Sequence, residues 1–310
     1  MCIRDRQTLI VGGVGAPIDL NGKDLSLTGD GVIQVNGGVT TWSTGITTIY
    51  ASGAGVKEFN GVIDNSTNML SFNVDTGATL RINGDPNLLG LGITGLGSIE
   101  KKGAGTLVLA ANNQLGSGTF TLDAGTVLVG HNNGLGGWSG PAIEFAGGVL
   151  GATGPAGTEI ILDNLWVVKD LGGGNAAPIR IGGNRRLVLN DVSLKSFGNQ
   201  TIEVLDPQAA AVIPAQITMN PNSTLTMTGP GRLVIGSDLS NLYVNSGVVL
   251  KADGPGRYEI QGTISTWGGQ AQIAFTPGGG STLVLAKDNT GALTGTVTVP
   301  TGSTLVLGDT

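Results

Sequence analysis

The chain has 310 residues, of which 55 are glycine, and only 12% are charged and 4% aromatic. Ordinary domains have about 7% glycine and about 25% charged residues. A mean hydropathy of +0.21 argues against disorder, and 16 Lys and Arg residues without a basic stripe argue against a nucleic-acid partner. The sequence has no apolar run of about 18 residues, the length that predicts a membrane-spanning helix. Glycine interrupts every run at the helical period, so the composition favours short strands and tight turns.

The first six residues, MCIRDR, differ from the rest of the chain and are interpreted as a scar of sequencing. Without them the sequence has no cysteine, and its net charge of −6 becomes −7 because the six residues carry +1. They precede the first strand pattern, so we expect no strand from them. We expect residues 7–310 to be a single β-helical fragment, open at both ends and without its signal peptide.

A short strand pattern recurs along the chain. Each copy has four or five residues of alternating character bounded by Gly, Asn or Asp, which is typical of a strand between turns. Looser copies are KDLSLTG (23–29), GATLRING (77–84) and NSTLTMTG (222–229). The five clearest copies are GAGTLVLA (103–110), NRRLVLND (184–191), GPGRLVIG (229–236), GGSTLVLA (279–286) and TGSTLVLG (301–308).

Further strands follow these copies at a nearly fixed spacing. TLVL at 106 is followed by TFTL at 119 and TVLV at 126, and TLVL at 282 is followed by TVTV at 296 and TLVL at 304. Two strands with their turns in about 20 residues make one coil of a solenoid. We therefore predict an all-β fold, a right-handed parallel β-helix (β-solenoid) of about 20–25 residues per coil and about 13 to 15 coils. Residues 170–180 and 205–223, rich in Gly, Pro or Ala, are expected to leave the solenoid as loops.

The alternation within the five clearest copies predicts which side chains face the interior. The leucine and isoleucine residues point inward, and the valine between them points outward. These valines are spaced at near multiples of one coil, so they are expected to form an interrupted apolar stripe on one face. That stripe is either ordinary exposed strand surface or a surface for lateral association. The inward residues are Leu107, Leu109, Leu187, Leu189, Leu233, Ile235, Leu283, Leu285, Leu305 and Leu307, and the valines are Val108, Val188, Val234, Val284 and Val306.

Residues 98–151 contain a longer motif. It consists of K-x-G-x-G-T-L-x-L, an Asn turn, two further G-T strands and a Leu-Gly pair. The matching residues are Lys101, Gly103, Gly105, Thr106, Leu107, Leu109, Asn112, Gly118, Gly125, Thr126, Val129, Leu135 and Gly136. In this order the segment resembles the autotransporter-associated β-strand repeat of passenger domains. Gly134, where the family has Ala, and Phe120, where Thr is usual, depart from the pattern, and residues 277–308 match it more weakly.

The resemblance implies a protein that is secreted or displayed at the outer-membrane surface of a Gram-negative-type bacterium. The family usually carries a C-terminal outer-membrane β-barrel, to which nothing in these 310 residues corresponds. A membrane is therefore expected only through missing flanking regions. The resemblance also implies a non-catalytic rod that presents a surface for adhesion to a host cell, a matrix or a glycan, or for self-association. The ligand, the anchor, the source organism and the oligomeric state stay open.

Two motifs have the spacing of a known site without its structural setting. Gly90–Gly95 matches the G-x-G-x-x-G spacing of a dinucleotide-binding loop, but a turn and a strand follow it instead of a helix, so no nucleotide site is expected. Ser98 and Lys101 match the S-x-x-K spacing of a catalytic pair on a helix, but on a strand they point to opposite faces.

The remaining reactive side chains occur singly. His131, the only histidine, lies in a predicted turn and cannot complete a zinc site without cysteine. Asp163, Asp170 and Asp191 adjoin turns, where aspartate suits the local backbone. We therefore predict no catalytic, cofactor-binding or metal-binding residue, and no cofactor.

The aromatic and basic side chains also have a structural interpretation. The tryptophans are expected to fill turns or cap loops rather than stack on sugars. The adjacent basic pairs are expected to be solvated. These residues are Trp42, Trp138, Trp166 and Trp267, and the pairs Lys101–Lys102 and Arg185–Arg186.

The alternative function is a carbohydrate-active β-helix, such as a polysaccharide lyase, a hydrolase or a phage tailspike. Such proteins bring carboxylates, or basic residues with acids, to one height of one face. The sequence has no D-x-D pair and no glycine-rich nonapeptide that would bind calcium, although scattered acids can converge when coils stack. A non-enzymatic display module is the preferred interpretation.

Overall fold

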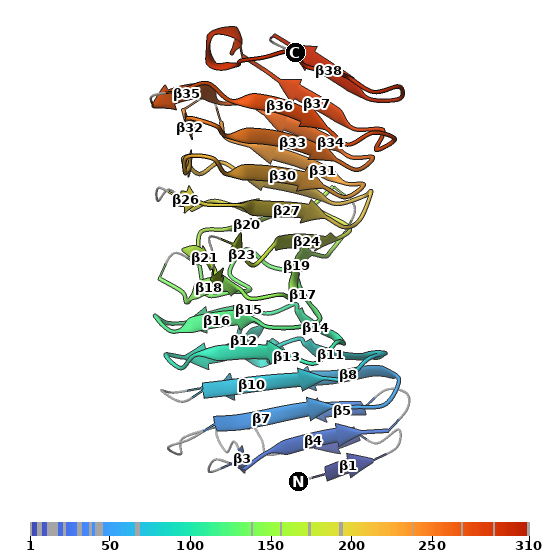
Figure 1. Ribbon diagram of the computed structural model, residues 1–310. Coiled ribbons are helices and arrows are strands. Elements are labelled where there is room, and N and C mark those ends of the chain that lie inside the picture. Colours follow the sequence, from blue (N-terminus) through green and yellow to red (C-terminus); the bar gives the residue numbers. More distant parts are fainter. Residues whose placement is uncertain are drawn as a thin grey trace. The chain divides into compact units, whose positions relative to one another are not determined.

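The computed structural model is all-β, with 56% strand and 2% helix, and confirms the predicted parallel β-helix (Figure 1). The chain divides into two compact units. The first unit comprises Met1–Thr153 and Leu162–Val167, and the second comprises Gly154–Ile161 and Val168–Thr310. The structure describes residues 2–4, 8–10, 18–20, 23–29, 33–36, 39–40, 46–65, 69–137, 139–155, 157–172, 175–191, 195–237, 239–267, 269–287 and 289–308.

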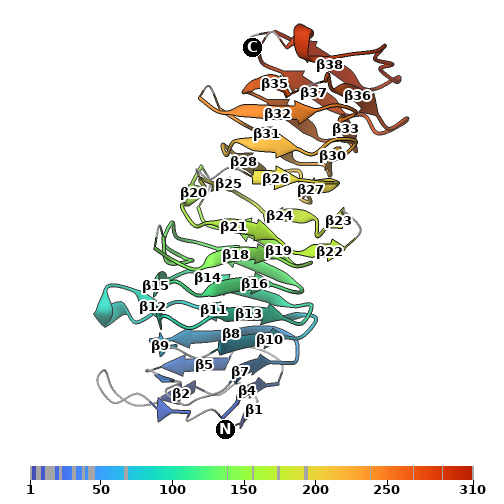
Figure 2. The same cartoon turned by 60° about the vertical axis from the view of Figure 1, so that its left-hand side comes forward.

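The first unit is built from three sheets, here named A, B and C (Figures 1 and 2). Sheet A contains, in spatial order, β1 (Cys2–Arg4), β4 (Leu25–Thr28), β7 (Ile46–Ala51), β10 (Met69–Val74), β13 (Ile99–Lys102), β16 (Thr119–Leu122), β18 (Ala142–Phe145) and β21 (Trp166–Val168). Sheet B contains β2 (Thr8–Ile10), β5 (Ile33–Asn36), β8 (Gly55–Asn60), β11 (Ala78–Ile82), β14 (Thr106–Leu109), β17 (Thr126–Val129) and β19 (Val149–Ala152). Sheet C contains β3 (Ile18–Asp19), β6 (Val39–Thr40), β9 (Ile63–Asp64), β12 (Leu91–Gly95) and β15 (Asn112–Leu115).

The second unit is likewise built from three sheets, named D, E and F. Sheet D contains β20 (Glu159–Leu162), β25 (Arg186–Leu189), β28 (Ala210–Ile213), β31 (Arg232–Ile235), β34 (Arg257–Ile260), β37 (Thr282–Leu285) and β38 (Thr304–Leu307). Sheet E contains β24 (Ile179–Gly183), β27 (Gln200–Val204), β30 (Thr224–Thr228), β33 (Val249–Asp253) and β36 (Gln272–Phe275). Sheet F contains β26 (Lys195–Phe197), β29 (Ile217–Met219), β32 (Asn241–Asn245) and β35 (Thr263–Trp267).

The described helices are two short 3-10 turns. None of them is long or apolar enough to span a membrane. They are η1 (Pro86–Leu88) and η2 (Thr290–Ala292).

Strands of successive coils pair in parallel, one coil apart. Leu107 pairs with Val127 after twenty residues, but Leu80 pairs with Leu107 after twenty-seven. In the second unit Leu233 pairs with Tyr258 after twenty-five. These longer coils account for about eleven turns over the described residues, fewer than the ~13 to 15 predicted from the shortest spacing.

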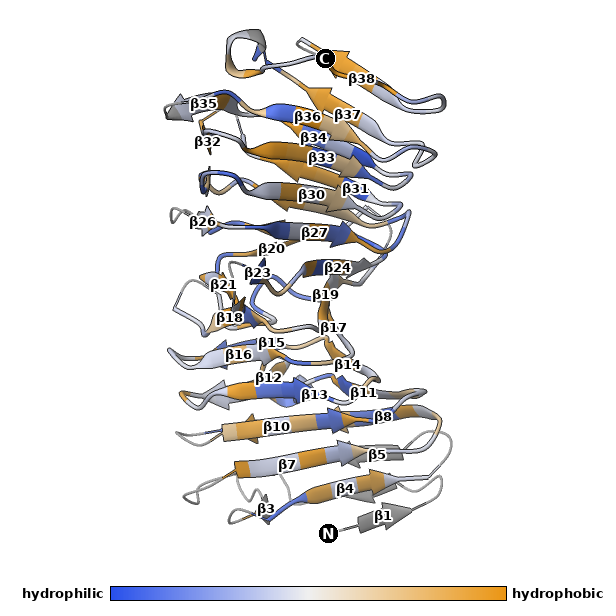
Figure 3. Cartoon of the chain, viewed as in Figure 1, coloured by the Kyte–Doolittle hydropathy of each residue, from blue (hydrophilic) through white to orange (hydrophobic). Residues whose placement is uncertain are grey.

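The interior of each unit consists of rows of apolar side chains that run from coil to coil. In sheet B, Leu80, Leu107, Val127 and Leu150 follow one another in register and are fully buried. Strands about 4.8 Å apart place each of these side chains against its counterpart in the next coil. Figure 3 shows the same apolar character in β37 of the second unit. Hydrophobic burial along these rows is the main force that holds the coils together.

The two predicted loops have different outcomes. The first leaves the solenoid as an exposed antiparallel hairpin of β22 (Asp170–Gly172) and β23 (Asn175–Ala176), and the chain then enters β24. The prediction for residues 205–223 is wrong, because this segment supplies β28 and β29 to the solenoid. Its prolines, Pro207, Pro214 and Pro221, lie between the strands, where no ladder hydrogen bond is needed.

Two further expectations near the chain ends are also wrong. The first six residues do contain a strand, since Cys2 pairs with Ser26 as part of β1 and β4. A sheet edge offers unpaired backbone groups to any adjacent segment, largely regardless of its side chains. Conversely, residues 296–299 form no strand, and Val297 and Val299 stay partly exposed. Without interior contacts, their alternating pattern does not suffice to fix an extended pairing.

Glycine is required at one corner of the first unit for two separate reasons. Gly125 has φ +69°, and a Cβ there would lie 2.4 Å from the carbonyl oxygens of both Gly103 and Gly105. Gly77 has a similar φ of +80°, but a Cβ there would meet no atom within 4 Å. Substitution of Gly77 therefore tests the strain of a left-handed backbone alone, whereas substitution of Gly125 also tests the close packing between coils.

We expect Gly77→Ala to lower the free energy of unfolding by about 1 kcal/mol, the strain of a left-handed alanine. Gly125→Ala should lower it by several kcal/mol, because the backbone of the neighbouring coil must also move. Denaturant unfolding followed by circular dichroism measures both. Equal losses would show that the coils do not pack as closely as described.

Candidate functional site

Lys101 is fully buried at the corner between β13 and β14. Its Nζ donates hydrogen bonds to the carbonyl oxygens of Lys102 and Gly103, each at 2.7 Å, and of Ala124 at 3.2 Å. Burial lowers the pKa of Lys101 to about 8, because desolvation disfavours the charged amine. The amine thus satisfies turn carbonyls that no strand neighbour reaches.

The prediction that both lysines are solvated is wrong for Lys101. It occupies an interior row of sheet A, in register with Phe72 and Leu122, and only its amine reaches the turn. Lys102 lies on the opposite face, where it is half-exposed and pairs with Glu100 at 2.9 Å. The two lysines lie on opposite faces because successive side chains of a strand point to opposite sides of the sheet.

Buried side chains donate hydrogen bonds to turn carbonyl oxygens at other corners as well. Lys57 is fully buried in an interior row of sheet B and donates to the carbonyl oxygens of Gly53 at 2.7 Å and Ala54 at 3.1 Å. In the second unit the Tyr258 hydroxyl donates to the Gly229 carbonyl at 2.8 Å, and burial raises the pKa of Tyr258 to about 12. The lysine of the K-x-G-x-G motif therefore has a structural role in closing the coil.

The two motifs with site-like spacing are structural as well. Gly90–Gly95 overlaps β12, and the strand expected after the motif is present as β13, so no helix begins there. Ser98 Oγ accepts a hydrogen bond from the Thr119 N–H at 3.1 Å, while the Lys101 amine bonds to carbonyls at the corner. The serine and the lysine do not form a catalytic pair.

The single histidine and the predicted aspartates are not brought together. His131 is exposed, and its Nδ1 accepts from the Asn133 N–H at 3.0 Å, which confirms its position in a turn. Asp170 accepts from the Gly172 N–H at 2.7 Å, and Asp191 is buried at the end of β25. Over the described part of the chain, no three His, Cys, Asp or Glu side chains gather closely enough to hold a metal ion.

Trp166 has the filling role predicted for it. It is fully buried and packs edge-on against Phe145, with ring centroids 6.3 Å apart and an interplanar angle of 88°, a favourable aromatic geometry. Trp42, Trp138 and the side chain of Trp267 lie outside the described residues.

The outer face of sheet D carries a charge cluster that the sequence did not reveal. Glu259 is 4% exposed and accepts from Arg232 Nε at 2.8 Å and from Arg257 Nε at 2.6 Å. Burial raises the pKa of Glu259, but the hydrogen bonds from the two guanidinium groups outweigh it and lower the pKa overall. Arg232 and Glu259 are 27 residues apart, so only the coil register brings them together.

The arginine pair predicted to be solvated adjoins this face. Arg186 is exposed and forms an ion pair with Glu159. Arg185 is less exposed, and its Nε donates to the Gly154 carbonyl at 2.8 Å. The prediction holds for Arg186 but only partly for Arg185.

The predicted row of valines exists on sheet D. Val188, Val212 and Val234 pair in register and form a separate cluster against Ile161. The row continues through Glu259, Val284 and Val306. Val108 does not belong to it, because β14 lies in sheet B.

The valines lie on the face opposite the inward leucines, as predicted, but they do not form an exposed stripe. The exposed fraction is 8% for Val188, 4% for Val234 and 0% for Val284, whereas Val306 stays partly exposed. Because coils repeat every ~4.8 Å, side chains above and below enclose each valine, and arginines of the adjacent row reach across the face to Glu259. Little apolar surface is left for lateral association.

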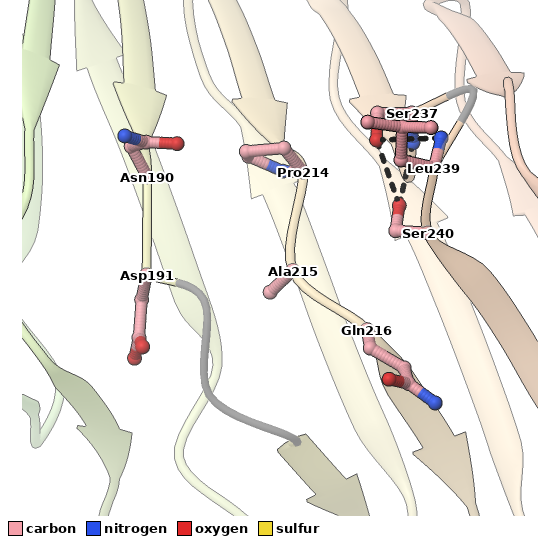
Figure 4. Close-up of a pocket in the computed structure, with 8 residues that line it drawn as sticks. All are labelled: Asn190, Asp191, Pro214, Ala215, Gln216, Ser237, Leu239 and Ser240. Atoms are coloured by element: carbon pink, nitrogen blue, oxygen red, sulfur yellow. Dashed lines mark hydrogen bonds between the residues drawn. The ribbon is translucent and has the colours of Figure 1, made fainter.

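A hollow of about 280 Å³ lies at a corner of the second unit, lined by residues that follow β25, β28 and β31 (Figure 4). The Ser237 N–H donates to Ser240 Oγ at 2.6 Å, and this tight turn exposes 98% of Leu239. Among the described residues that line the hollow, Asp191 is the one with an acidic side chain.

Comparison with known proteins found no match. No family model matches the chain, and no curated protein and no solved structure matches it. The resemblance of residues 98–151 to the autotransporter-associated repeat stays a prediction.

We expect Lys101→Met to lower the free energy of unfolding by about 1–3 kcal/mol at pH 7, because three carbonyl oxygens lose a donor. In the folded chain the pKa of Lys101 is about 8, below the ordinary lysine value of 10.5. Between these two pH values the unfolded chain therefore binds a proton that the folded chain lacks. Stability of the unmodified chain therefore rises with pH across this window, and its advantage over Lys101→Met should widen.

Denaturant titrations at pH 7, 8, 9 and 10 measure this difference. Lys102→Met is the matched control, with an expected loss of about 0.5 kcal/mol or less, since the side chain is half-exposed. If the Lys101→Met difference stays constant over this pH range, the amine is not buried as described.

We expect Glu259→Gln to destabilise the chain by about 1–2 kcal/mol at pH 7, because two arginines lose a charged acceptor. The lowered pKa means that this contribution is present above the usual carboxyl range and disappears as the pH falls through the native pKa. The variant and the unmodified chain should thus converge in acid. Glu203→Gln removes the carboxylate that pairs with Arg180, and this side chain is more exposed than that of Glu259. We expect it to lower the free energy of unfolding by less than about 1 kcal/mol. Equal losses at the two positions would contradict the special burial of Glu259.

Proposed function

We propose that this chain is a non-catalytic β-solenoid module of a secreted or cell-surface protein that presents its outer faces for adhesion or interaction. The observation that carries the proposal is the arrangement of charge on those faces. Arg232 and Arg257 pair with Glu259 on sheet D, and Arg180 pairs with Glu203 on sheet E. Arg232 pairs with Glu259 and Arg180 with Glu203 across coils, whereas Arg257 and Glu259 lie on the same strand. The faces thus present a regular array of side chains in which most of the charged groups are paired.

The resemblance of residues 98–151 to autotransporter passenger repeats supports this proposal. Lys101 and Gly125 of the matched motif both serve the coil corner, one by donating to turn carbonyls and the other by allowing close approach. A motif with such a role builds a scaffold of repeated coils. The resemblance also supports the proposal that the module lies outside the cell, at the surface of a Gram-negative-type bacterium, with a host cell, a matrix or a glycan as its partner.

A carbohydrate-active β-helix is the second candidate, favoured by one specific observation. Glu100 and Glu144 lie on one row of sheet A, with Thr121 between them in register. Two strand spacings correspond to roughly 10 Å, near the upper end of the separation found in inverting glycosidases. Against this, Glu100 pairs with Lys102, and Glu144 accepts from the Thr121 hydroxyl at 3.1 Å, so both carboxylates already have partners on the face.

We expect the purified chain to bind a coated surface of mucin, fibronectin or collagen saturably, and to release no reducing ends or unsaturated products from polysaccharides. Surface plasmon resonance and a reducing-end assay measure the two properties, with a surface of serum albumin as the control. Binding without turnover follows from faces on which the charged groups are already paired.

Turnover that is lost in both Glu100→Gln and Glu144→Gln would establish the enzyme instead. Thr106→Ala, on sheet B, is the matched control and should change neither property. Failure to bind any of the three coated surfaces would count against the adhesive role.

A further inference from the structure

The third side of the first unit changes its structure at one coil. Sheet C ends in space with β15, and in the following coil residues 131–137 and 139–140 form turns and bends in place of a strand. Gly136 has φ +86°, and a Cβ there would lie 2.7 Å from the Leu115 carbonyl oxygen. Glycine therefore lets this loop lie directly against β15.

A hollow of about 470 Å³ lies between this loop and β12 and β15, which share one side of the unit in Figure 2. Among the described residues that line it, none has a charged side chain. Its polar side chains are amides and a hydroxyl, those of Asn112, Asn113, Gln114, Asn133 and Ser139.

Two kinds of polar group line this amide hollow. Asn113 is buried and serves the fold, because its Oδ1 accepts from the Ile93 N–H at 2.7 Å and its Nδ2 donates to the Gly134 carbonyl at 2.6 Å. Gln114 and Ser139 are exposed. Within the described residues the structure gives neither side chain a hydrogen-bond partner. An amide and a hydroxyl supply both donors and acceptors to a ligand.

Two leucines, Leu96 and the buried Leu115, also line the hollow. Leu96 is 61% exposed at its edge, and a Cβ on Gly116 would come within 2.1 Å of the Leu96 Cδ2. Glycine at this position leaves the space that the leucine occupies. The hollow therefore combines neutral hydrogen-bonding groups with an apolar surface.

We propose that the amide hollow binds a short segment of a neutral glycan, a proposal that rests on the proposed surface role and names its ligand class. Sugar hydroxyls pair with the Gln114 amide and the Ser139 hydroxyl, and the C–H face of a sugar ring packs on Leu96. An anionic polysaccharide finds no cation among the lining residues and would lose hydration without a paired charge. An extended peptide finds the β15 edge occupied, because the Asn113 N–H donates to the Asn133 carbonyl at 3.1 Å.

The test is titration of the full chain with maltotetraose, cellotetraose, chitotetraose and tetragalacturonate, followed by saturation-transfer NMR and calorimetry. At least one of the three neutral probes should bind, and the anionic one should not. Gln114→Ala and Ser139→Ala should each weaken binding by about five-fold, the loss of one hydrogen bond. Gln272→Ala, an exposed glutamine on β36 of the second unit, should leave it unchanged.

Three results would overturn the glycan site: no binding of any neutral probe, equal or tighter binding of tetragalacturonate, or unchanged affinity in both Gln114→Ala and Ser139→Ala. Circular dichroism of each variant shows whether the fold is retained, and Leu96→Ser provides a further variant at an exposed position. The adhesive role is judged separately on mucin, fibronectin and collagen surfaces. If the chain still adheres to these surfaces but binds no oligosaccharide, the glycan site is wrong and the adhesive role still stands.

Discussion

Parallel stacking is the constraint on which the rest of this structure depends. A strand in a solenoid hydrogen-bonds only to the strands of the coils before and after it, so register decides which side chains become neighbours. Val188 stands beside Val212 and Arg180 beside Glu203 for this reason alone. With strands only about 4.8 Å apart, each row must hold side chains that tolerate close repetition. Apolar rows satisfy this by packing, and charged side chains satisfy it by pairing with an opposite charge, as Arg180 does with Glu203 and Arg232 with Glu259.

Stacking satisfies the strands but leaves the corners without regular partners. Carbonyl oxygens in the turns cannot all reach another coil, and buried ones need a donor. Lys57, Lys101 and Tyr258 provide it from within, each with its stem or ring in an interior row and its polar end at a turn. The charged amine is tolerated in the interior because it is surrounded by acceptors. The residues that appear most reactive in the sequence are thereby used to close the coil.

Function is then left to the outer faces and to places where the coil is interrupted. On sheet D the arginines that pair with Glu259 reach it from the adjacent row, so that face has charged groups beside its apolar row. On the third side of the first unit, residues 131–137 and 139–140 form turns and bends in place of a strand, and a hollow lies beside Gln114 and Ser139. A regular strand in that coil would continue the sheet and present a flat row. Irregular coils on a regular scaffold are the natural positions for recognition.

The sequence alone determined the fold class and most of the inward leucines, because these depend on local alternation and on glycine turns that repeat at a nearly fixed spacing. Of the ten residues expected inside, Leu305 is partly exposed and Leu307 is 55% exposed, and coils such as the one from Leu80 to Leu107 are longer than predicted. The sequence also placed His131 in a turn. It could not determine that Lys101 is buried beside an exposed Lys102, because that depends on which face the neighbouring coil encloses. Nor could it bring Arg232 to Glu259, which are 27 residues apart and become neighbours only through the register of stacked strands. Ser139 and Gln114 line one hollow because the loop that holds Ser139 lies against β15.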